Sequence, residues 1–329
     1  MTMANLLRPH RRTLRAAAIL GAGLLATGAA HAAYPERAIS MVVAYPPGGG
    51  VDTVARVLSV ELSKLLKQSV VVENKPGAGA TIGASYVKRA TPDGYTLLLA
   101  DPAFVINTGL MTNVGYDLKK DFTPVSTVTM SPIVLSVYPG LPVHSLAELL
   151  EAARRKPGGL SYSSAGIGST PHMAGEMLKA YTNSSFTHIP YKGSGPAMSN
   201  LVAGQLDFSF STIAAAKPFI DQKLIRPLAT TGLERSPALP ELPTIAESIP
   251  GFKVLFWTAL FAPANTPPAV VKALNEAMRT VLTDPQTKAA IEKSGDVATY
   301  LPTEKVNDFV AGEFAQWTGL IAKAGIKAE

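Results

Sequence analysis

The feature that most constrains the fold is a regular alternation of two kinds of segment along the chain. Short apolar runs predict buried strands, and longer segments with apolar residues every three or four positions predict amphipathic helices. This alternation favours an α/β fold with largely parallel sheets, because helices then serve as crossover connections. The predicted strands are 39–44, 69–73, 96–100, 133–138, 160–163, 186–189, 206–210, 225–229 and 254–261. The predicted helices are 54–66, 82–89, 145–155, 171–180, 196–203, 268–282, 285–293 and 304–323.

The first predicted connection from a strand to a helix contains three consecutive glycines. Residues 45–53 read YPPGGGVDT and lie between the predicted strand 39–44 and the helix that follows. A strand that turns on glycines into a helix leaves free backbone N–H groups, and the helix dipole adds partial positive charge there. The loop is therefore a candidate anion seat, although any tight strand-to-helix turn needs glycine.

Three later glycine-rich turns repeat this arrangement. They cover residues 75–83, 164–170 and 191–196. In the second of them Thr170 is the expected N-cap of a helix, with Pro171 at the first helical position. The spacing of Gly77, Gly79 and Gly83 misses the dinucleotide-binding pattern by one residue. Several such helix N-termini around one cleft would hold an anionic ligand with little need for arginine.

The N-terminal segment has the order of a secretory signal peptide. It carries four arginines and no acid, then an apolar stretch at 16–26, then the small-x-small site Ala30-His31-Ala32. The apolar stretch is short for a permanent membrane anchor. We expect residues 1–32 to be removed near Ala32 and the mature protein to be exported. The general secretory and twin-arginine routes both remain open.

Charge and cysteine content exclude several classes of function. The chain has 30 Lys+Arg and 24 Asp+Glu. Four of the basic residues lie in the leader, so the rest carries 26 against 24 and is nearly balanced. This gives no support for nucleic-acid binding. The chain has no cysteine, which excludes disulfides, thiol nucleophiles and thiolate metal sites.

Residues that would carry catalysis are sparse. Beyond the leader the only histidines are His144, His172 and His188, and none has metal-ligand spacing to another. His172 and Glu176 lie four apart on a predicted helix, where they are either a functional pair or a first-turn histidine beside a solvated acid. There is no Gly-x-Ser-x-Gly elbow and no P-loop. We therefore expect no enzyme, no metal and no cofactor.

An ordered set of motifs resembles one known family. The set comprises YPERAI at 34–39, PPGGGVD at 46–52, ENKPGAG at 73–79, PDGYTL at 92–97, KDFTPV at 120–125, HIPYKG at 188–193 and LPTI at 242–245. Together these motifs resemble the substrate-binding proteins of tripartite tricarboxylate transporters, also called Bug receptors. The resemblance covers the chain from Tyr34 to the last predicted helix.

The resemblance implies a periplasmic clamshell of two domains, each a mainly parallel sheet flanked by helices. One domain would comprise residues 33–136 plus 258–329, and the other residues 137–257. Proline-rich segments near 132–142 and 263–268 suit a chain that crosses twice between domains, with hinge crossings near 132–142 and 252–263. Such a protein, expected to be a monomer, captures a small carboxylate-bearing ligand and presents it to membrane transporter subunits. The ligand would be a di- or tricarboxylate, an acidic amino acid or an aromatic acid.

The resemblance also implies a set of ligand-binding residues. Loops matching 45–52 and 77–83 would hold one end of the ligand, and the loop matching 164–170 would hold the other. From the residues themselves, a carboxylate would bind N–H groups at 48–50, and a second polar end would meet the hydroxyls of 169–170 and the ammonium of 192. The candidates are Tyr45, Pro47, Gly48, Gly49, Gly50, Asp52, Gly79, Ala80, Phe104, Ser164, Gly168, Ser169, Thr170, Tyr191, Lys192, Ser211 and Trp257.

Several of these candidates have a second interpretation. Phe104 and Trp257 would pack the apolar body of a ligand or lie in the core. The segment 101–104 lacks the hydroxyl residue common in relatives, and Ser211 stands where many relatives carry aspartate, which weakens the case for an amino-acid ligand. We expect the Asp52 carboxylate to cap its own loop. A ligand sensor with a membrane partner and an exported hydrolase are the alternative functions.

Overall fold

The computed structural model describes residues 34–327. From Arg37 onward the described chain forms one compact unit that carries the fold. The predicted signal peptide lies outside the described residues. Within residues 34–327, no helix has the length and apolar character needed to cross a bilayer.

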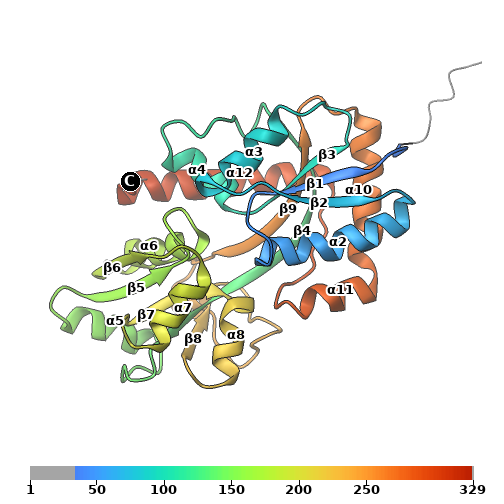
Figure 1. Ribbon diagram of the computed structural model, residues 1–329. Coiled ribbons are helices and arrows are strands. Elements are labelled where there is room, and N and C mark those ends of the chain that lie inside the picture. The colour runs from blue at the N-terminus through green and yellow to red at the C-terminus, as the bar shows by residue number, and fades with distance from the viewer. Residues whose placement is uncertain (1–33, 328–329) are drawn as a thin grey trace, which may run out of the picture. The chain divides into compact units, whose positions relative to one another are not determined.

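The described chain alternates strands and helices as the periodicity predicts (Figure 1). The strands are β1 (Ile39–Val43), β2 (Val70–Asn74), β3 (Thr96–Ala100), β4 (Phe122–Val137), β5 (Leu160–Ser164), β6 (Phe186–Pro190), β7 (Phe208–Thr212), β8 (Arg226–Thr230) and β9 (Leu255–Pro263). The helices are α2 (Gly50–Leu66), α3 (Thr81–Lys88), α4 (Ala103–Leu110), α5 (Leu146–Arg155), α6 (Thr170–Thr182), α7 (Ser194–Val202), α8 (Ile213–Asp221), α9 (Ile245–Ser248), α10 (Pro268–Thr283), α11 (Pro285–Glu292) and α12 (Thr303–Ala324). A 3₁₀ turn, η1 (Ala78–Ala80), precedes α3.

The strands form one mixed sheet in the order β2-β1-β3-β9-β4-β7-β5-β6, with β8 also paired to β4. The outer pairs are parallel, namely β1 with β2 and β3, and β5 with β6 and β7. The central pairs, which involve β4 and β9, are antiparallel. The prediction of largely parallel sheets thus holds for the outer strands and not for the centre, where two long strands run against their neighbours.

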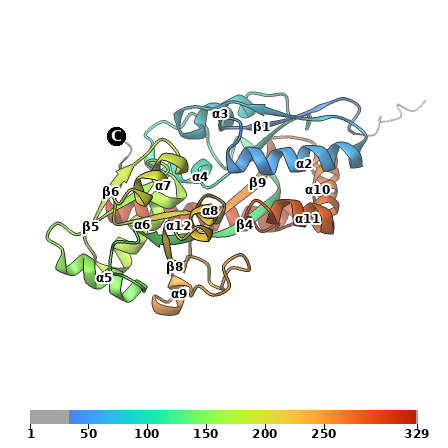
Figure 2. The ribbon, with the colours of Figure 1, turned by 60° about the horizontal axis from the view of Figure 1, so that its bottom comes forward.

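Strand β4 divides the sheet into two half-sheets. Its N-terminal part pairs with β9, and its C-terminal part pairs with β7 and β8. The first half-sheet is therefore β2-β1-β3-β9 with the start of β4, and the second is the end of β4 with β7, β5, β6 and β8. Helices α2, α10 and α11 lie together beside the first half-sheet, and α7 and α8 lie together on the second (Figures 1 and 2).

Three elements differ from the sequence prediction for reasons that can be identified. The first part of β4 is rich in threonine, serine and proline and contains two register shifts, so it lacks the regular alternation of a strand. Helix α4 begins directly after Asp101-Pro102 and is apolar on nearly every side, so it shows no helical period. Helix α8 contains Pro218, which reads as a helix breaker.

Candidate ligand-binding site

Loops that follow the parallel strands of the first half-sheet meet at one edge. Strands β1, β2 and β3 end at Val43, Asn74 and Ala100, and their registers bring these ends side by side. The carboxyl edge of a parallel sheet is where ligands bind in open α/β folds. The glycine-rich loops 44–50 and 75–80 are thus brought together by the strand pairing.

The Asp52 carboxylate caps the first of these loops from beneath. It accepts a hydrogen bond from the Gly48 N–H at 2.9 Å, two from the Arg56 guanidinium and one from the Asn74 amide. Its side chain is 2% exposed. Burial alone would raise the pKa of Asp52, but these hydrogen bonds outweigh burial and lower the pKa to about 2. The carboxylate therefore belongs to the structure of the loop, and the Gly48 N–H is already used.

The first turn of α2 keeps its remaining N–H groups uncapped. Gly49 is the N-cap in extended conformation, and no side chain caps the helix. Residues 46–50 are exposed. The helix dipole therefore directs partial positive charge from Gly50 toward solvent at this edge.

A second backbone feature of the same kind lies in η1. Four successive residues, Gly77 to Ala80, have positive φ, including 46° at Ala78 and 76° at Ala80. Such conformations are costly for alanine and concentrate at functional sites. Helix α3 follows Ala80 without a side-chain cap. Consecutive residues of this type form N–H concavities suited to anions.

Asp101 is a buried acid at the same edge. Its Oδ2 accepts a hydrogen bond from the Tyr45 hydroxyl at 2.7 Å. Burial raises the pKa of Asp101 to about 6, although the hydrogen bonds from Tyr45 and from the backbone of 103–104 oppose the shift. Burial and the Asp101 charge together raise the pKa of Tyr45 well above its usual value. This pair ties the loop after β1 to the loop after β3.

The second half-sheet presents its own loop between β5 and α6. The N-cap of α6 is Ser169 and not Thr170 as predicted, and Pro171 follows as the second helical residue. The Ser169 hydroxyl accepts from the His172 N–H and donates to the Gly166 carbonyl at 2.6 Å, so it is fully engaged. Thr170 is the first helical residue, is 3% exposed, and has no hydroxyl partner among residues 34–327.

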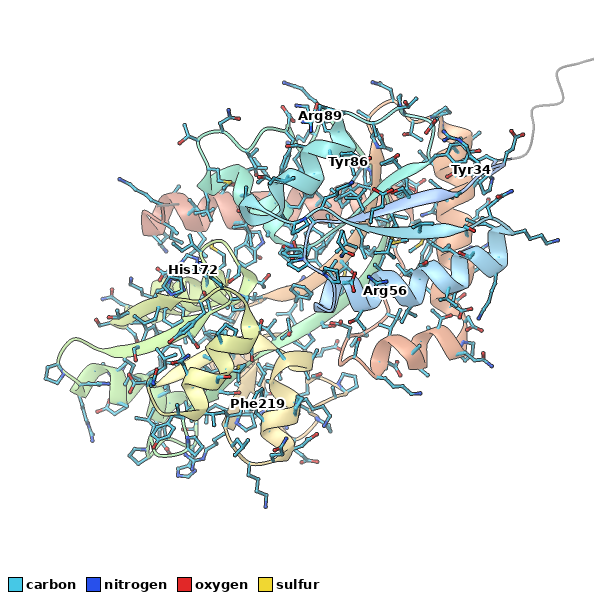
Figure 3. The ribbon with its side chains drawn as sticks, in the orientation of Figure 1. Tyr34, Arg56, Tyr86, Arg89, His172 and Phe219 are labelled. Atoms are coloured by element: carbon cyan, nitrogen blue, oxygen red, sulfur yellow. The ribbon has the colours of Figure 1, made fainter. Side chains whose placement is uncertain are left out.

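A buried imidazole, His172, and a half-buried one, His188, hold this loop in place. The Gly168 N–H donates to His172 Nδ1 at 3.1 Å, and Ser164 Oγ lies 2.7 Å from His188 Nε2. The two rings stack with centroids 4.1 Å apart. Burial lowers the pKa of His172 to about 4 and that of His188 to about 3, so both are neutral near pH 7. Figure 3 shows His172 on α6 and Arg56 on α2.

Ser164 and His188 have the spacing of a nucleophile and a base, but not the setting. Ser164 is completely buried, so a substrate carbonyl cannot reach its hydroxyl. His172 and Glu176, the other sequence candidates for chemistry, are also buried, and Glu176 accepts a hydrogen bond from Tyr162. Within the described chain no cluster of three or more possible metal ligands is found.

The two sets of loops meet at Asn107, a residue that the sequence analysis missed. Its Nδ2 donates to the Gly79 carbonyl at 2.6 Å. On the other side, a Cβ placed on Gly168 would lie 3.1 Å from Asn107 Oδ1 and 3.0 Å from Leu110 Cδ1. The only available signal was an amide within the apolar run 104–110, which becomes α4.

The remaining candidates fall into three groups. Pro47 and Lys192 are exposed, and Tyr191 lies beside the second loop because its N–H donates to the Ser164 carbonyl at 3.2 Å. Phe104 and Trp257 lie in the core, Phe104 against three aromatic rings and Trp257 with its indole bound to Glu313. Ser211 is buried opposite Val134, and its hydroxyl has no partner among residues 34–327.

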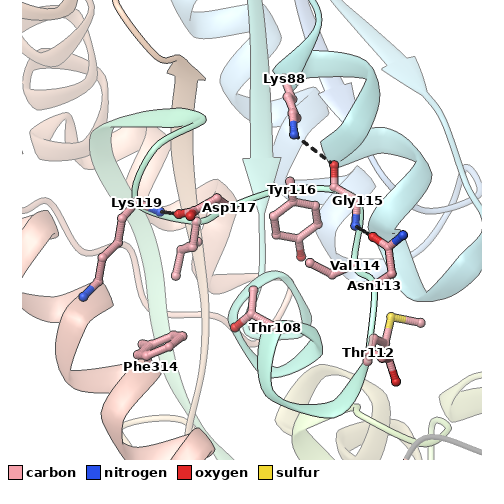
Figure 4. Close-up of a pocket in the computed structure, with 12 residues that line it drawn as sticks. Lys88, Thr108, Thr112, Asn113, Val114, Gly115, Tyr116, Asp117, Lys119 and Phe314 are labelled. Carbon is pink, nitrogen blue, oxygen red and sulfur yellow. Dashed lines mark hydrogen bonds between the residues drawn. The ribbon is translucent and has the colours of Figure 1, made fainter.

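A hollow of the described surface lies elsewhere. A cavity of about 660 Å³ is bordered by the loop 111–119, Lys88, Thr108 and Phe314 (Figure 4). None of the sequence candidates lines it. Its polar groups are engaged locally, since Lys88 donates to the Gly115 carbonyl and pairs with Asp121.

Comparison with known proteins identifies the family. Residues 54–326 match the model of the tripartite tricarboxylate transporter family receptor, TctC. The chain belongs to this family. It is therefore a substrate-binding receptor and not an enzyme. A protein encoded in the tcbD-tcbE intergenic region of Pseudomonas sp. strain P51 is 38% identical over 90% of this chain and 89% of its own. Protein BugT of Bordetella pertussis is 35% identical over 89% and 91%.

Solved structures of relatives share the fold. Rpa4515 of R. palustris with adipate has a TM-score of 0.82 and 35% identity, over 89% of this chain and 99% of its own. MatC from Rhodopseudomonas palustris with bound malate has a TM-score of 0.78 and 31% identity, over 88% and 100%. The periplasmic binding protein BugD has a TM-score of 0.79 and 35% identity, over 90% and 100%. The resemblance read from the motifs and the predicted clamshell fold class are thus confirmed, and this family of receptors is periplasmic and binds carboxylates.

Proposed function

We propose that this receptor captures a small dicarboxylate between the two half-sheets and presents it to the membrane subunits of a tripartite transporter. The observation that carries the proposal is the convergence at Asn107 of η1 and the loop 166–170, which come from different half-sheets. A site shared by two halves suits a ligand with a polar group at each end. Adipate and malate, bound by two structural relatives, have this form.

One carboxylate of the ligand would bind the backbone of the first half-sheet. The uncapped first turn of α2 and the positive-φ residues of η1 supply N–H groups there. Because the Gly48 N–H is held by Asp52, we assign the seat to the N–H groups that follow it, from Gly49 on, together with η1. The other carboxylate would meet the free Thr170 hydroxyl and the exposed Lys192 ammonium. Ser169 is engaged in capping and contributes through its position rather than its hydroxyl.

We further propose that the half-sheets act as two domains, 33–136 plus 258–329 and 137–257. Strands β4 and β9 are the segments that cross near the proposed boundaries. A ligand that touches both sides then stabilises the closed arrangement by its higher affinity for that arrangement. The mature protein would work in the periplasm as a monomer after removal of the leader.

The test is a thermal-shift and calorimetry series with adipate, malate and longer and shorter dicarboxylates. The matched control is the uncharged diamide of each acid. At a ligand concentration 100 times Kd, stabilisation of about 2.7 kcal/mol is expected for a true ligand. Thr170→Ala should weaken dicarboxylate binding about tenfold and leave the fold intact, because its hydroxyl has no partner to lose. Equal shifts with diamides and diacids would exclude the anion seat.

A further inference from the structure

The closeness of Gly168 to Asn107 suggests a function beyond packing. We propose that this contact limits how far the two half-sheets close and thereby selects ligands by length. The inference rests on the proposed function, since it concerns the same cleft. It makes Asn107 a positioning residue that need not touch the ligand.

Asn107 is fixed to the first half-sheet side. Its side chain is 5% exposed, and the neighbouring Val105 and Ile106 are completely buried in the core. Helix α4, which carries it, packs on α12 and on η1. The hydrogen bond from Nδ2 to the Gly79 carbonyl fixes the orientation of the amide, because the oxygen could not bind a carbonyl. Oδ1 therefore points away from η1 and toward Gly168.

Gly168 is fixed equally well to the second half-sheet side. Its N–H is bound to His172 Nδ1, and its φ of +77° is a conformation that favours glycine. Because that N–H is already used, it cannot bond to Asn107 Oδ1. The two rigidly held residues thus lie close together without a hydrogen bond between them, so further approach would bring them into steric contact. Such a contact resists approach but does not pull the halves together.

This contact and the ligand seat are mechanically connected. The same Asn107 side chain binds η1, which we assign to the carboxylate seat, and abuts the loop that leads into Thr170. The packing of Asn107 against Gly168 therefore sets the distance between the two ends of the ligand site. A fixed distance discriminates among ligands, since one methylene group in a fitted pocket changes affinity by roughly 10-fold or more.

Changing the size of the two groups should shift the preferred length in opposite directions. Gly168→Ala adds a methyl group that Asn107 and Leu110 must yield to by a few tenths of an ångström, so closure stops earlier. Asn107→Ala removes the obstacle, so closure proceeds further. Asn107→Leu keeps a similar volume and removes only the bond to Gly79, so it should weaken all ligands alike.

The control for Gly168→Ala is Gly158→Ala. Gly158 has φ of +83°, close to that of Gly168, but a Cβ there would have no heavy atom within 4 Å. It lies before β5, at the opposite end of that strand from Gly168. Both variants therefore carry the same backbone cost, and only one carries the new contact.

The experiment is calorimetric titration of the wild type and the four variants with straight-chain dicarboxylates from malonate to suberate. Gly168→Ala should raise the affinity ratio of longer to shorter acids about tenfold relative to Gly158→Ala, and Asn107→Ala should lower it. Circular dichroism tests whether each variant folds. If Gly168→Ala does not fold, a comparison of the preferred ligand length in Asn107→Ala and Asn107→Leu still tests the inference. If the folded variants show the same dependence of affinity on dicarboxylate length as the wild type, this inference is wrong, while the proposed function still stands. A wild type that binds no acid of the series would overturn the proposed function.

Discussion

The hydroxyl of Tyr45 donates a 2.7 Å hydrogen bond to Asp101, and this bond joins the two loops that border the proposed anion seat. Asp101 is 6% exposed, and burial is the largest influence on the pKa of its carboxyl. An ionised acid in this position costs folding free energy, because burial disfavours the charged form. The acid is thus a feature whose effect on stability depends on pH.

Replacing Asp101 with asparagine should stabilise the protein at neutral pH. The folded pKa of about 6 lies above the ordinary value of about 3.9, so the folded state binds more protons between these values. The stability contributed by the protonated acid is therefore lost as pH rises through about 6. Asp101→Asn keeps an acceptor for Tyr45 and has no charge. Its advantage in unfolding free energy should grow from about pH 4 and level off above about pH 6, at about 3 kcal/mol.

Chemical denaturation at several pH values measures this difference. Tyr45→Phe serves as the control, because it removes the hydrogen bond that Asp101→Asn keeps and leaves the acid ionisable. A difference between Asp101→Asn and the wild type that does not vary with pH would contradict the assignment.

The two stacked imidazoles should impose the opposite pH dependence. His172 and His188 have folded pKa values of about 4 and about 3, below the ordinary 6.5. Below about pH 6.5 these histidines bind protons in the unfolded chain but not in the folded chain. The stability that the neutral imidazoles contribute is therefore fully present above that pH and is lost as pH falls toward 4. His172→Gln, which keeps an acceptor for the Gly168 N–H, should reduce this loss of stability at acidic pH. Urea unfolding of His172→Gln and of the wild type across that range tests it, and the same slope in both would contradict the assignment.

How much of this site the sequence could predict depends on the range of the interactions. The glycine loops and the capping role of Asp52 follow from neighbours within a few residues, and the structure has both. Thr170 was misplaced by one position, because Ser169 and Thr170 are both good N-caps and only the fold chooses between them. Asn107 could not be found, since its partner Gly79 lies 28 residues away and its contact Gly168 belongs to the other half-sheet.

The same distinction applies to the fold. Strand β3 matches its predicted bounds, because an apolar run between turn residues depends on local sequence alone. The first part of β4 depends instead on β9, which lies more than 120 residues later and supplies its ladder. The aromatic residues Phe104 and Trp257 show the ambiguity of composition, since an aromatic side chain fits a ligand pocket or a core equally well until its neighbours are known.

Asp52 should matter far more to the first loop than its ion-pair partner does. Asp52→Ala removes the buried acceptor that the Gly48 N–H and the half-buried Asn74 amide share, at a cost of about 2–3 kcal/mol. Arg56→Ala removes a guanidinium that is 55% exposed, so it should destabilise the protein much less. Because the Asp52 pKa is depressed to about 2, its contribution is present above about pH 4 and is lost as pH falls toward 2.

Guanidinium unfolding of the two single variants and the double variant separates these effects. Asp52→Ala should also weaken dicarboxylate binding, because the loop 46–50 loses its internal support. Equal destabilisation by Asp52→Ala and Arg56→Ala would mean that the ion pair, and not the backbone cap, holds the loop.

A buried carboxylate binds both tryptophans of the chain. Glu313 Oε2 accepts hydrogen bonds from Trp257 Nε1 at 2.8 Å and from Trp317 Nε1 at 3.0 Å, and thereby ties α12 to β9. Glu313→Ala would leave two buried indole N–H groups unpaired and should destabilise the fold by about 3 kcal/mol. Glu313→Gln keeps a carbonyl acceptor and should stay within about 1 kcal/mol of the wild type. Burial raises the pKa of Glu313, so the glutamine variant should also gain relative stability as pH rises. Since the chain has only these two tryptophans, their fluorescence during urea unfolding reports this region directly. Equal losses of unfolding free energy in the alanine and glutamine variants would show that the shared acceptor does not hold α12 in place.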